Sequence, residues 1–319
     1  MNILFHENQL CERGTTVALY DYAWFTHELL GVNPVITYNK RSENNKEMAI
    51  EKFKKEFIVI GYEDFSEVPG IIDQYRIDAF YAIKAGDLDG VIVPNAKNLI
   101  HSVFCNNSET IHGDVYAVIS EWMSIVSGDH IPYVPHMLNL PNHTEDLRKF
   151  LNIPKDAFVI GRYGGYNTFD VYFARDSIST VLEKRKDIWF LFMNTYPVYT
   201  HERCLYLDLS YDNNIKKAFV NTCDAMLHAR VHGETFGLAV LEFAAYNKQI
   251  ISYDNYVGGR NHFMYLQGNC YAYRTKEMLD DILLNINRRN RFDTTYLKDK
   301  FSPKNVVAQF NRVFLENTI

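Results

Sequence analysis

Residues 224–244 read Asp224-Ala-Met-Leu-His-Ala-Arg-Val-His-Gly-Glu-Thr-Phe-Gly-Leu-Ala-Val-Leu-Glu-Phe-Ala244. The opening residues form a short apolar run that is typical of a buried strand, and the later residues are expected to be helical. Gly233 and Gly237 lie between these elements and favour a tight turn that a ligand can approach closely. We therefore expect a strand over Asp224–His228 and a helix over Phe236–Tyr246, an order typical of parallel α/β sheets.

The same alternation of short apolar runs and helix-period stretches extends along the chain on both sides. It predicts two parallel sheets covered by helices. The strands are expected at Asn2–Phe5, Asn33–Tyr38, Glu56–Gly61, Asp78–Lys84, Asn98–Phe104, Val115–Ser120, Ala157–Gly161, Ile188–Asn194, Leu205–Leu209, Asp224–His228 and Gln249–Tyr253. The helices are expected at Thr15–Leu30, Ser42–Lys55, Asp146–Leu151, Tyr172–Arg185, Asn213–Asn221, Phe236–Tyr246, Thr275–Ile286 and from Ser302 onward.

Prolines mark the expected domain boundary. Pro132, Pro135 and Pro141 cluster in one short segment, which favours an extended linker. We predict two Rossmann-like domains that face a cleft, residues 1–137 and 138–301. Ser302-Pro303 is a favourable helix start, and we expect this final helix, 302–319, to return to the first domain.

Composition and charge exclude several classes of protein. The 319 residues are 47% hydrophobic and 23% charged, as in folded globular proteins. Lys and Arg number 33 against 39 Asp and Glu, for a net charge of −6, which disfavours nucleic acid and anionic membranes as partners. No apolar run approaches the ~20 residues that span a bilayer. The five cysteines form no CxxC pair, as expected of reduced thiols in the cytosol.

Two carboxylates flank the turn at residues 233–237. A helix that begins at Phe236 would point the N–H groups of Phe236, Gly237 and Leu238 outward, where they can bind a diphosphate without a metal ion. Glu242 on this helix can accept hydroxyl donors from a ribose, and Glu234 before it can accept them from a sugar. The competing interpretation is a capping box at Thr235, in which Glu234 serves only the helix dipole.

Arg/Gly turns follow the opening strand of each predicted domain. They are Arg13-Gly14 in the first and Gly161-Arg162-Tyr-Gly-Gly165 in the second. Such turns bring backbone N–H groups to phosphate oxygens, but glycines also occur there simply to permit tight turns. His228 and His232 have a four-residue spacing that would suit zinc on a helix. Their flanks predict a strand and a turn and no third ligand lies nearby, so we expect no metal site.

The segment Gly233–Glu242 resembles the Glu-x7-Glu donor motif of retaining GT-B glycosyltransferases, especially glycosyltransferase family 4. Val115–Glu121, the proline linker, the Gly161-Arg162 turn and Gln249–Tyr253 follow the family's order over nearly the whole chain. These enzymes hold a nucleotide sugar mainly in the C-terminal domain and an acceptor mainly in the N-terminal domain. The resemblance therefore implies a GT-B fold and sugar transfer with retained anomeric configuration.

The resemblance also implies roles for individual residues. Glu234 would contact the donor sugar and Glu242 the ribose, while the acceptor side would include Arg13 and Gly14. The phosphates would be held by Arg162 and by Thr235, Phe236, Gly237 and Leu238. Gly164, Gly165, Arg230 and Gly233 would also bind the donor. A nucleotide-diphosphate sugar is the expected donor, and no separate cofactor is expected.

The sequence departs from the family pattern at two places. The family usually has a Lys six residues after the Arg of the Gly-Arg turn, where this chain has Thr168, and Arg230 or Arg260 is a possible replacement. The family also often has a catalytic His at the end of its fourth N-terminal strand, where this chain reads Ile83-Lys84-Ala-Gly86. The candidates for that role are Lys84, His101 and His112.

The leading hypothesis is a retaining glycosyltransferase that transfers a sugar to a glycan, a lipid-linked acceptor or a small molecule. One alternative is a nucleotide-sugar epimerase or a phosphorylase with the same fold. Another is a catalytically silent GT-B scaffold that binds a sugar or a protein. Hydrolysis of nucleotide sugars separates an enzyme from a scaffold, because a scaffold would release no nucleotide.

Overall fold

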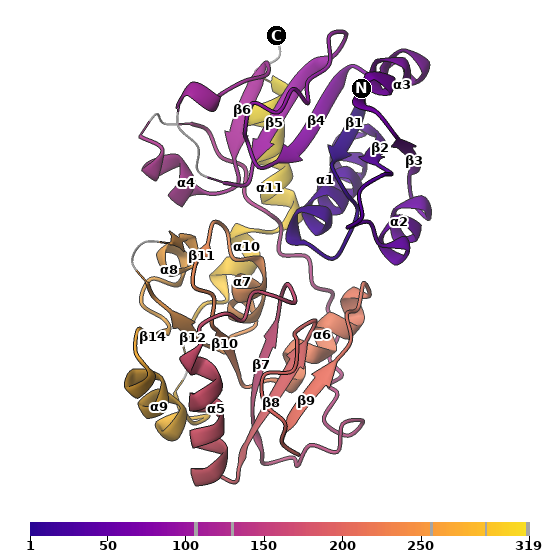
Figure 1. The fold of residues 1–319 in the computed structure, drawn as a ribbon. Helices are drawn as coiled ribbons and strands as arrows, with labels where there is room; N and C mark the ends of the chain where they lie inside the picture. Colours follow the sequence, from indigo (N-terminus) through magenta and orange to yellow (C-terminus); the bar gives the residue numbers. More distant parts are fainter. Residues whose placement is uncertain (105–107, 129–130, 256–257, 291, 317–319) are drawn as a thin grey trace. The chain divides into compact units, whose positions relative to one another are not determined.

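The computed structural model describes residues 1–104, 108–128, 131–255, 258–290 and 292–316. The chain divides into two compact units (Figure 1): Met1–Asn139 with Lys300–Ile319, and Leu140–Asp299. Each unit contains one six-stranded sheet, and the neighbouring strands of both sheets pair in parallel. The expected α/β fold with two Rossmann-like halves is therefore confirmed.

The sheet of the first unit has the strand order β3-β2-β1-β4-β5-β6. Its strands are β1 (Asn2–Glu7), β2 (Asn33–Asn39), β3 (Ile58–Tyr62), β4 (Ala79–Lys84), β5 (Lys97–Ser102) and β6 (Val115–Val118). The helices of this unit are α1 (Gly14–Leu30), α2 (Glu47–Lys54), α3 (Val68–Tyr75), α4 (Glu121–Val126) and α11 (Pro303–Phe310). Two of them, α3 and α4, were not predicted.

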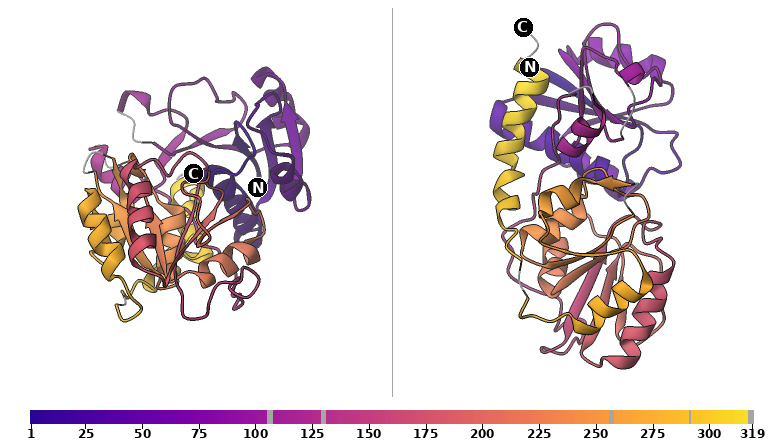
Figure 2. Two further views of the ribbon diagram at one scale, coloured as in Figure 1. Left: turned by 60° about the horizontal axis from the view of Figure 1, so that its bottom comes forward. Right: turned by 90° about the vertical axis from the view of Figure 1, so that its left-hand side faces the viewer.

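The C-terminal helix belongs to the first unit, as expected. Ser302 caps α11 by accepting a hydrogen bond from the N–H of Asn305, and Pro303 occupies the first turn. The helix continues as a π-helical segment over Asn311–Leu315, and Figure 2 shows it along the first unit. Buried Phe310 lies 5.5 Å from the ring of Tyr22 in α1, so the burial of aromatic rings attaches the C-terminus to this core.

The sheet of the second unit has the order β14-β12-β10-β7-β8-β9. Its strands are β7 (Phe158–Tyr163), β8 (Ile188–Met193), β9 (Cys204–Leu207), β10 (Ala225–His228), β12 (Gln249–Tyr253) and β14 (Tyr271–Tyr273), and a separate pair joins β11 (Gly233–Glu234) to β13 (Gly259–Arg260). The helices are α5 (Phe173–Lys184), α6 (Asn213–Thr222), α7 (Leu238–Ala245), α8 (Asn261–Leu266), α9 (Lys276–Asn285) and α10 (Tyr296–Lys300).

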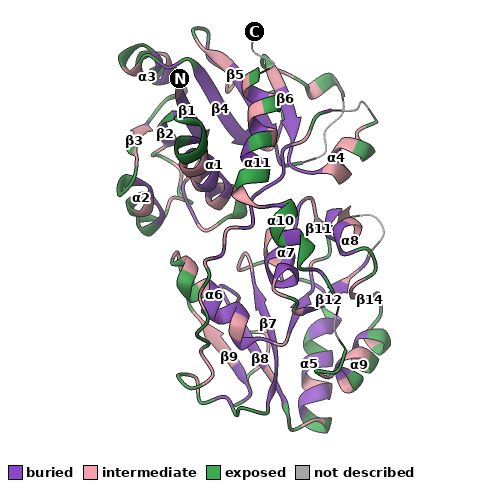
Figure 3. Ribbon diagram, turned by 180° about the vertical axis from the view of Figure 1, so that it is seen from behind, coloured by how far each residue is buried: buried purple, intermediate pink, exposed green. Residues whose placement is uncertain are grey.

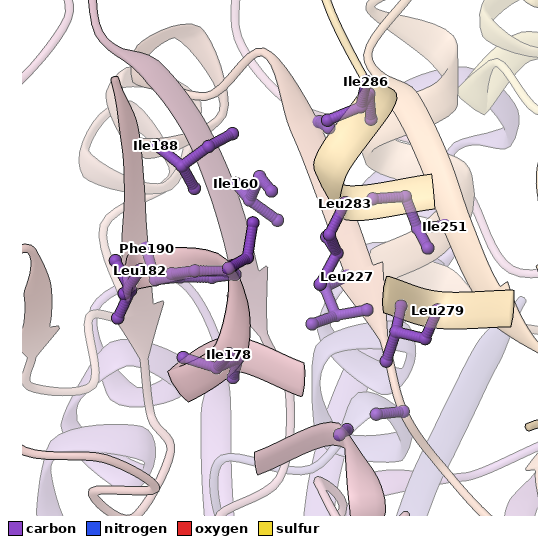
Figure 4. Packing of buried hydrophobic residues seen from close by; sticks show 14 of the residues in the cluster. Ile160, Ile178, Leu182, Ile188, Phe190, Leu227, Ile251, Leu279, Leu283 and Ile286 are labelled. Atoms are coloured by element: carbon purple, nitrogen blue, oxygen red, sulfur yellow. The ribbon is translucent and has the colours of Figure 1, made fainter. Parts of the chain in front are cut away.

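Apolar side chains fill both faces of the second sheet. On one face, residues of α5 such as Ile178 and of α9 such as Leu283 pack against the strands (Figure 4). On the other face, Tyr163 contacts Phe219 of α6, with 5.7 Å between ring centroids. Figure 3 shows the central strands as buried. Burial on both faces explains why these strands read as continuous apolar runs in the sequence.

One predicted helix is wrong. Residues 146–151 form no helix, and hydrogen-bonded turns cover residues 148–152 instead. The turn ends at Asn152, which has a positive φ of 54°, and Pro154 prevents a helical continuation. Separately, no helix among the described residues is long and apolar enough to span a bilayer.

Candidate active site

The connections of the second sheet place a candidate site at the ends of β7 and β10. From β7 the chain proceeds to β8 and β9, and it then returns to β10 on the other side of β7. Ligands of parallel α/β sheets bind outside the carboxyl ends of the strands at such a reversal. Here β7 ends in Arg162 and Tyr163, and β10 ends in His228.

A close approach of two glycine-containing segments sets the position of Glu234. Gly233 and Glu234 pair with Gly259 and Arg260 in parallel. A Cβ atom on Gly233 would lie 2.2 Å from the carbonyl oxygen of Gly259, and one on Gly259 would lie 2.4 Å from the carbonyl carbon of Glu234. Only glycine permits both contacts, so the β11–β13 pair fixes the backbone that carries Glu234.

A Gly259→Ala substitution is expected to lower the free energy of unfolding by roughly 1–3 kcal/mol, because the added methyl group collides with backbone. Urea denaturation measures this change. Gly70→Ala in α3 is a matched control, since no heavy atom lies within 4 Å of the added Cβ. An equal effect of the two substitutions would show that the β11–β13 contact is not tight.

Two basic side chains hold the Glu234 carboxylate. Arg230 Nη1 lies 2.9 Å from Oε2, and His228 Nε2 lies 3.1 Å from Oε1. Burial raises the pKa of Glu234, but the hydrogen bond from His228 and the charge of Arg230 outweigh burial and lower the pKa to about 2. The Glu234 side chain is still 20% exposed. It is therefore an ionised, oriented acceptor that a ligand can reach.

The helix after this turn begins later than predicted. Helix α7 starts at Leu238, and its N-cap is Gly237, with φ of 88° and no side-chain capping bond. The capping-box interpretation of Thr235 and Glu234 is therefore wrong, and so is a helix start at Phe236. Since the first intrahelical bond joins Leu241 N–H to the Gly237 carbonyl, the N–H groups that α7 leaves for an anion belong to residues 238–240.

Arg162 extends from β7 beneath the loop that follows this strand. Its Nη1 donates to the Asn194 carbonyl and the Thr195 hydroxyl, and its Nη2 donates to the Gly165 carbonyl at 3.0 Å and the Thr168 hydroxyl at 2.5 Å. Burial lowers the pKa of Arg162 to about 10, so the guanidinium stays protonated at neutral pH. Among the described residues it bonds only to neutral oxygens, which leaves its charge for an anionic ligand.

Two residues named in the sequence analysis, Thr168 and Gly164, lie next to the Arg162 guanidinium. Thr168, six residues after Arg162, accepts a hydrogen bond from Arg162 Nη2. A Cβ atom on Gly164 would lie 2.9 Å from Arg162 Nη2, so Gly164 makes room for the guanidinium. Of the two possible replacements for the Lys, Arg230 binds Glu234 and Arg260 forms an ion pair with Asp254.

Glu242 lies on the buried side of α7. The Tyr163 hydroxyl donates a hydrogen bond to Glu242 Oε2, and the residue is 5% exposed. Burial raises the pKa of Glu242, while the charge of Lys216 and the Tyr163 hydrogen bond lower it by less. Among the residues that the structure describes, Tyr163 is the one hydrogen-bond partner of this carboxyl group, and it links α7 to the carboxyl end of β7.

Two of the candidates for the missing catalytic His do not fit that role. His101 is fully buried, with Nδ1 2.6 Å from the Tyr81 hydroxyl and Nε2 2.9 Å from the Val134 carbonyl. Burial lowers its pKa to about 3, so His101 is a core residue and the catalytic expectation is wrong. His112 precedes β6 and therefore lies at the amino end of that strand, opposite to the ligand-binding edge.

Three other predicted residues lie at the carboxyl edge of the first sheet. Lys84 ends β4, but its side chain is 2% exposed and forms an ion pair with Asp89. Arg13 and Gly14 begin α1 and are exposed. Glu7, which sequence analysis missed, ends β1 and accepts hydrogen bonds from Thr15 and Thr16. Burial raises the pKa of Glu7 to about 7, and its signal in the sequence is an acid after a buried strand.

The expectation of no metal site concerns His228 and His232. Within the described ranges, no group of three His, Cys, Asp or Glu side chains is placed to hold a metal ion. His228 is buried at the end of β10, whereas His232 is exposed in the following loop. The two histidines therefore do not share the helical face that their spacing would need for zinc.

No protein-family model and no curated protein sequence matches the chain. Solved structures do. A glycosyltransferase from Rickettsia africae has a TM-score of 0.73 at 14% identity, over 99% of each chain. HepE from Anabaena, in complex with UDP and glucose, has a TM-score of 0.74 at 11% identity, over 99% of this chain and 100% of that one.

A third similar structure is a proposed UDP-N-acetylglucosamine 2-epimerase from Listeria monocytogenes. Its TM-score is 0.66 at 11% identity, over 100% of this chain and 97% of that one. Similarity at this level establishes the fold. The chain has the GT-B fold.

Proposed function

We propose that the chain is a retaining glycosyltransferase that transfers a sugar from a nucleotide-diphosphate sugar to a glycan, a lipid-linked acceptor or a small molecule. One observation carries the proposal: an ionised carboxylate, Glu234, and a buried guanidinium, Arg162, that has no carboxylate partner among the described residues lie at the same edge of the second sheet. HepE, which has the same fold, was solved with UDP and glucose, the two kinds of ligand that these groups suit.

The charges of the site match those that develop during transfer. Cleavage of the bond between the anomeric carbon and the phosphate oxygen leaves positive charge on the sugar and negative charge on the diphosphate. Arg162 and the free N–H groups of α7 would stabilise the diphosphate, and the Glu234 carboxylate would accept sugar hydroxyls close to the positive charge. Because these groups are fixed before the reaction, they stabilise the transition state without reorganisation.

Glu242 and the first unit complete the proposal. Glu242 would accept the ribose hydroxyls with the carboxylate oxygen that Tyr163 does not occupy. The first unit, with Arg13 and Gly14 at the start of α1, would hold the acceptor. The resemblance of residues 233–242 to the family motif supports these assignments and the retention of configuration. We also propose a cytosolic location, where cysteines stay reduced.

A panel of nucleotide sugars tests the proposed function. We expect the full chain to release nucleoside diphosphate from one member of the panel, slowly with water and faster with an acceptor. Proton NMR of the first-formed sugar product should show the same anomeric configuration as the donor. An epimerised nucleotide sugar, an inverted product or no turnover with any donor would each refute the proposal.

Turnover is expected to survive EDTA, because Arg162 and backbone N–H groups supply the positive charge that a divalent ion would otherwise provide. The measurement is the rate of nucleotide release before and after dialysis against chelator. Loss of activity that Mn²⁺ or Mg²⁺ restores would contradict this assignment of the diphosphate site.

A further inference from the structure

A chain of buried polar side chains leads away from Glu234 into the second unit. His228 Nδ1 lies 2.9 Å from the Ser252 hydroxyl, which lies 2.9 Å from His262 Nε2. The three residues come from β10, β12 and α8, and each is at most 5% exposed. Burial of these polar groups costs desolvation, which their mutual hydrogen bonds offset, and a satisfied network of this kind is rigid.

We propose that His262, Ser252 and His228 are positioning residues that orient the Glu234 carboxylate for the sugar hydroxyls through hydrogen bonds donated in one direction. The inference rests on the proposed function, in which Glu234 contacts the donor sugar. It concerns the residues behind that carboxylate, which neither the motif nor the fold assigns.

The groups at the two ends of this hydrogen-bond chain, Glu234 and His262, determine the direction in which its protons are donated. Glu234 is ionised and can only accept, so His228 Nε2 must carry the proton. With Nε2 as the donor to Glu234, His228 Nδ1 accepts from the Ser252 hydroxyl, and Ser252 accepts from His262 Nε2–H. His262 Nδ1 has no partner among the described residues, which agrees with a ring protonated at Nε2. Burial lowers the pKa of His262 to about 3, so His262 adds no buried charge.

The hydrogen bonds from His228 and Arg230 leave the Glu234 carboxylate able to bind two hydroxyls. A carboxylate has about four lone-pair positions. His228 occupies one on Oε1 and Arg230 one on Oε2, so the partners among the described residues leave one position on each oxygen. A carboxylate held from both sides in this way presents its remaining positions at a fixed angle, which suits two adjacent hydroxyls of a pyranose ring.

Ser252→Ala tests the inference by removing the middle of the chain. We expect kcat to fall roughly fivefold, the value of one neutral hydrogen bond, while the Kd of the nucleoside diphosphate product is unchanged. A deoxy donor that lacks a hydroxyl contacted by Glu234 should react more slowly than the complete donor. This loss of kcat should be smaller in Ser252→Ala than in the parent. Ser177→Ala is the matched control, because the Ser177 hydroxyl is equally buried and has no partner among the described residues.

A conservative exchange and a spectroscopic measurement complete the test. His262→Gln keeps a donor near the Nε2 position and should retain more kcat than His262→Leu. In protein labelled with ¹⁵N-histidine, NMR should show His228 and His262 protonated at Nε2, and Ser252→Ala should shift both signals. Parental kcat and an unchanged deoxy penalty in Ser252→Ala, or a His262 ring protonated at Nδ1, would overturn the inference.

These results are distinct from a failure of the proposed function. If the parent turns over no nucleotide sugar, the proposed function fails, and the NMR tautomers still decide whether the chain is directed toward Glu234. If the parent is active and only the Ser252 effects are missing, the positioning role alone is refuted.

Discussion

Glu234→Gln is expected to lower kcat by two to three orders of magnitude, the effect of removing one preorganised electrostatic group from an active site. The carboxylate is held ionised by His228 and Arg230, with a pKa of about 2. Replacement by a neutral amide of the same shape removes the negative charge beside the sugar. The nucleoside diphosphate product should still bind nearly normally, because its proposed partners are Arg162 and the N–H groups of α7.

Two further variants serve as comparisons for the effect of Glu234→Gln on kcat. Glu242→Gln should mainly raise the donor KM, because ribose binding is the same in the ground state and the transition state. Glu202→Gln, an exposed substitution of the same kind, should leave both constants unchanged. Steady-state kinetics with a thermal melt of each variant separates catalysis from stability. Parental turnover in Glu234→Gln would remove the carboxylate from the mechanism.

Acidification from pH 6.5 to 4.5 is expected to cost the first unit about 5 kcal/mol, a large part of the stability of an ordinary domain. His6, His101 and His136 are buried there, and burial lowers each pKa from 6.5 to about 3. Below pH 6.5 the unfolded histidines take up protons and the folded ones do not. The unfolded chain therefore gains stability as the pH falls.

Glu7 acts in the opposite direction. Burial raises its pKa from 4.5 to about 7, so in this pH range the folded state holds a proton that the unfolded state has lost. Its stabilising contribution is present at low pH and disappears as the pH rises through 7. The net effect is about two protons taken up on unfolding, or about 3 kcal/mol per pH unit.

A Trp189→Phe variant allows this measurement in the first unit alone. It leaves Trp24 and Trp122, both in that unit, as the fluorophores. Urea unfolding at several pH values should give the predicted slope, and His101→Gln should reduce the slope by about one proton. His232→Gln, at an exposed position of the second unit, should not change it. Stability that is constant from pH 6.5 to 4.5 would contradict the buried neutral histidines.

The sequence predicted the sheets well because their strands are buried on both faces and read as uninterrupted apolar runs. It missed elements whose signal is short or mixed. Helix α3 begins with Pro69 in its first turn and contains Gly70, residues that usually indicate a turn. Strand β14 has only three residues, fewer than the periodicity of an apolar run can reveal.

The candidate site was predictable where a short stretch of sequence carries its own signal, as at the Gly161-Arg162 turn and at residues 233–242. Glu234 and Glu242 were recognised because one short segment contains both. Ser252 lies 24 positions from His228 and 10 from His262, and it joins them only because β10 and β12 pair in the sheet. The four-residue spacing of His228 and His232 has no structural counterpart, and the position of His101 on a strand does not reveal that its ring is fully buried.

Binding of nucleoside diphosphates to the full chain tests the central claim most directly. Calorimetric titration with UDP, GDP, ADP and TDP, each beside its nucleoside, should identify one diphosphate that binds. Arg162→Ala should weaken the binding of that diphosphate by ~1.5–3 kcal/mol, the value of a charge-assisted hydrogen bond. The binding of the nucleoside should change little. Arg289→Ala, at an exposed position, should bind both as the parent does. No binding of any diphosphate, or equal weakening of diphosphate and nucleoside in folded Arg162→Ala, would contradict a donor site at Arg162.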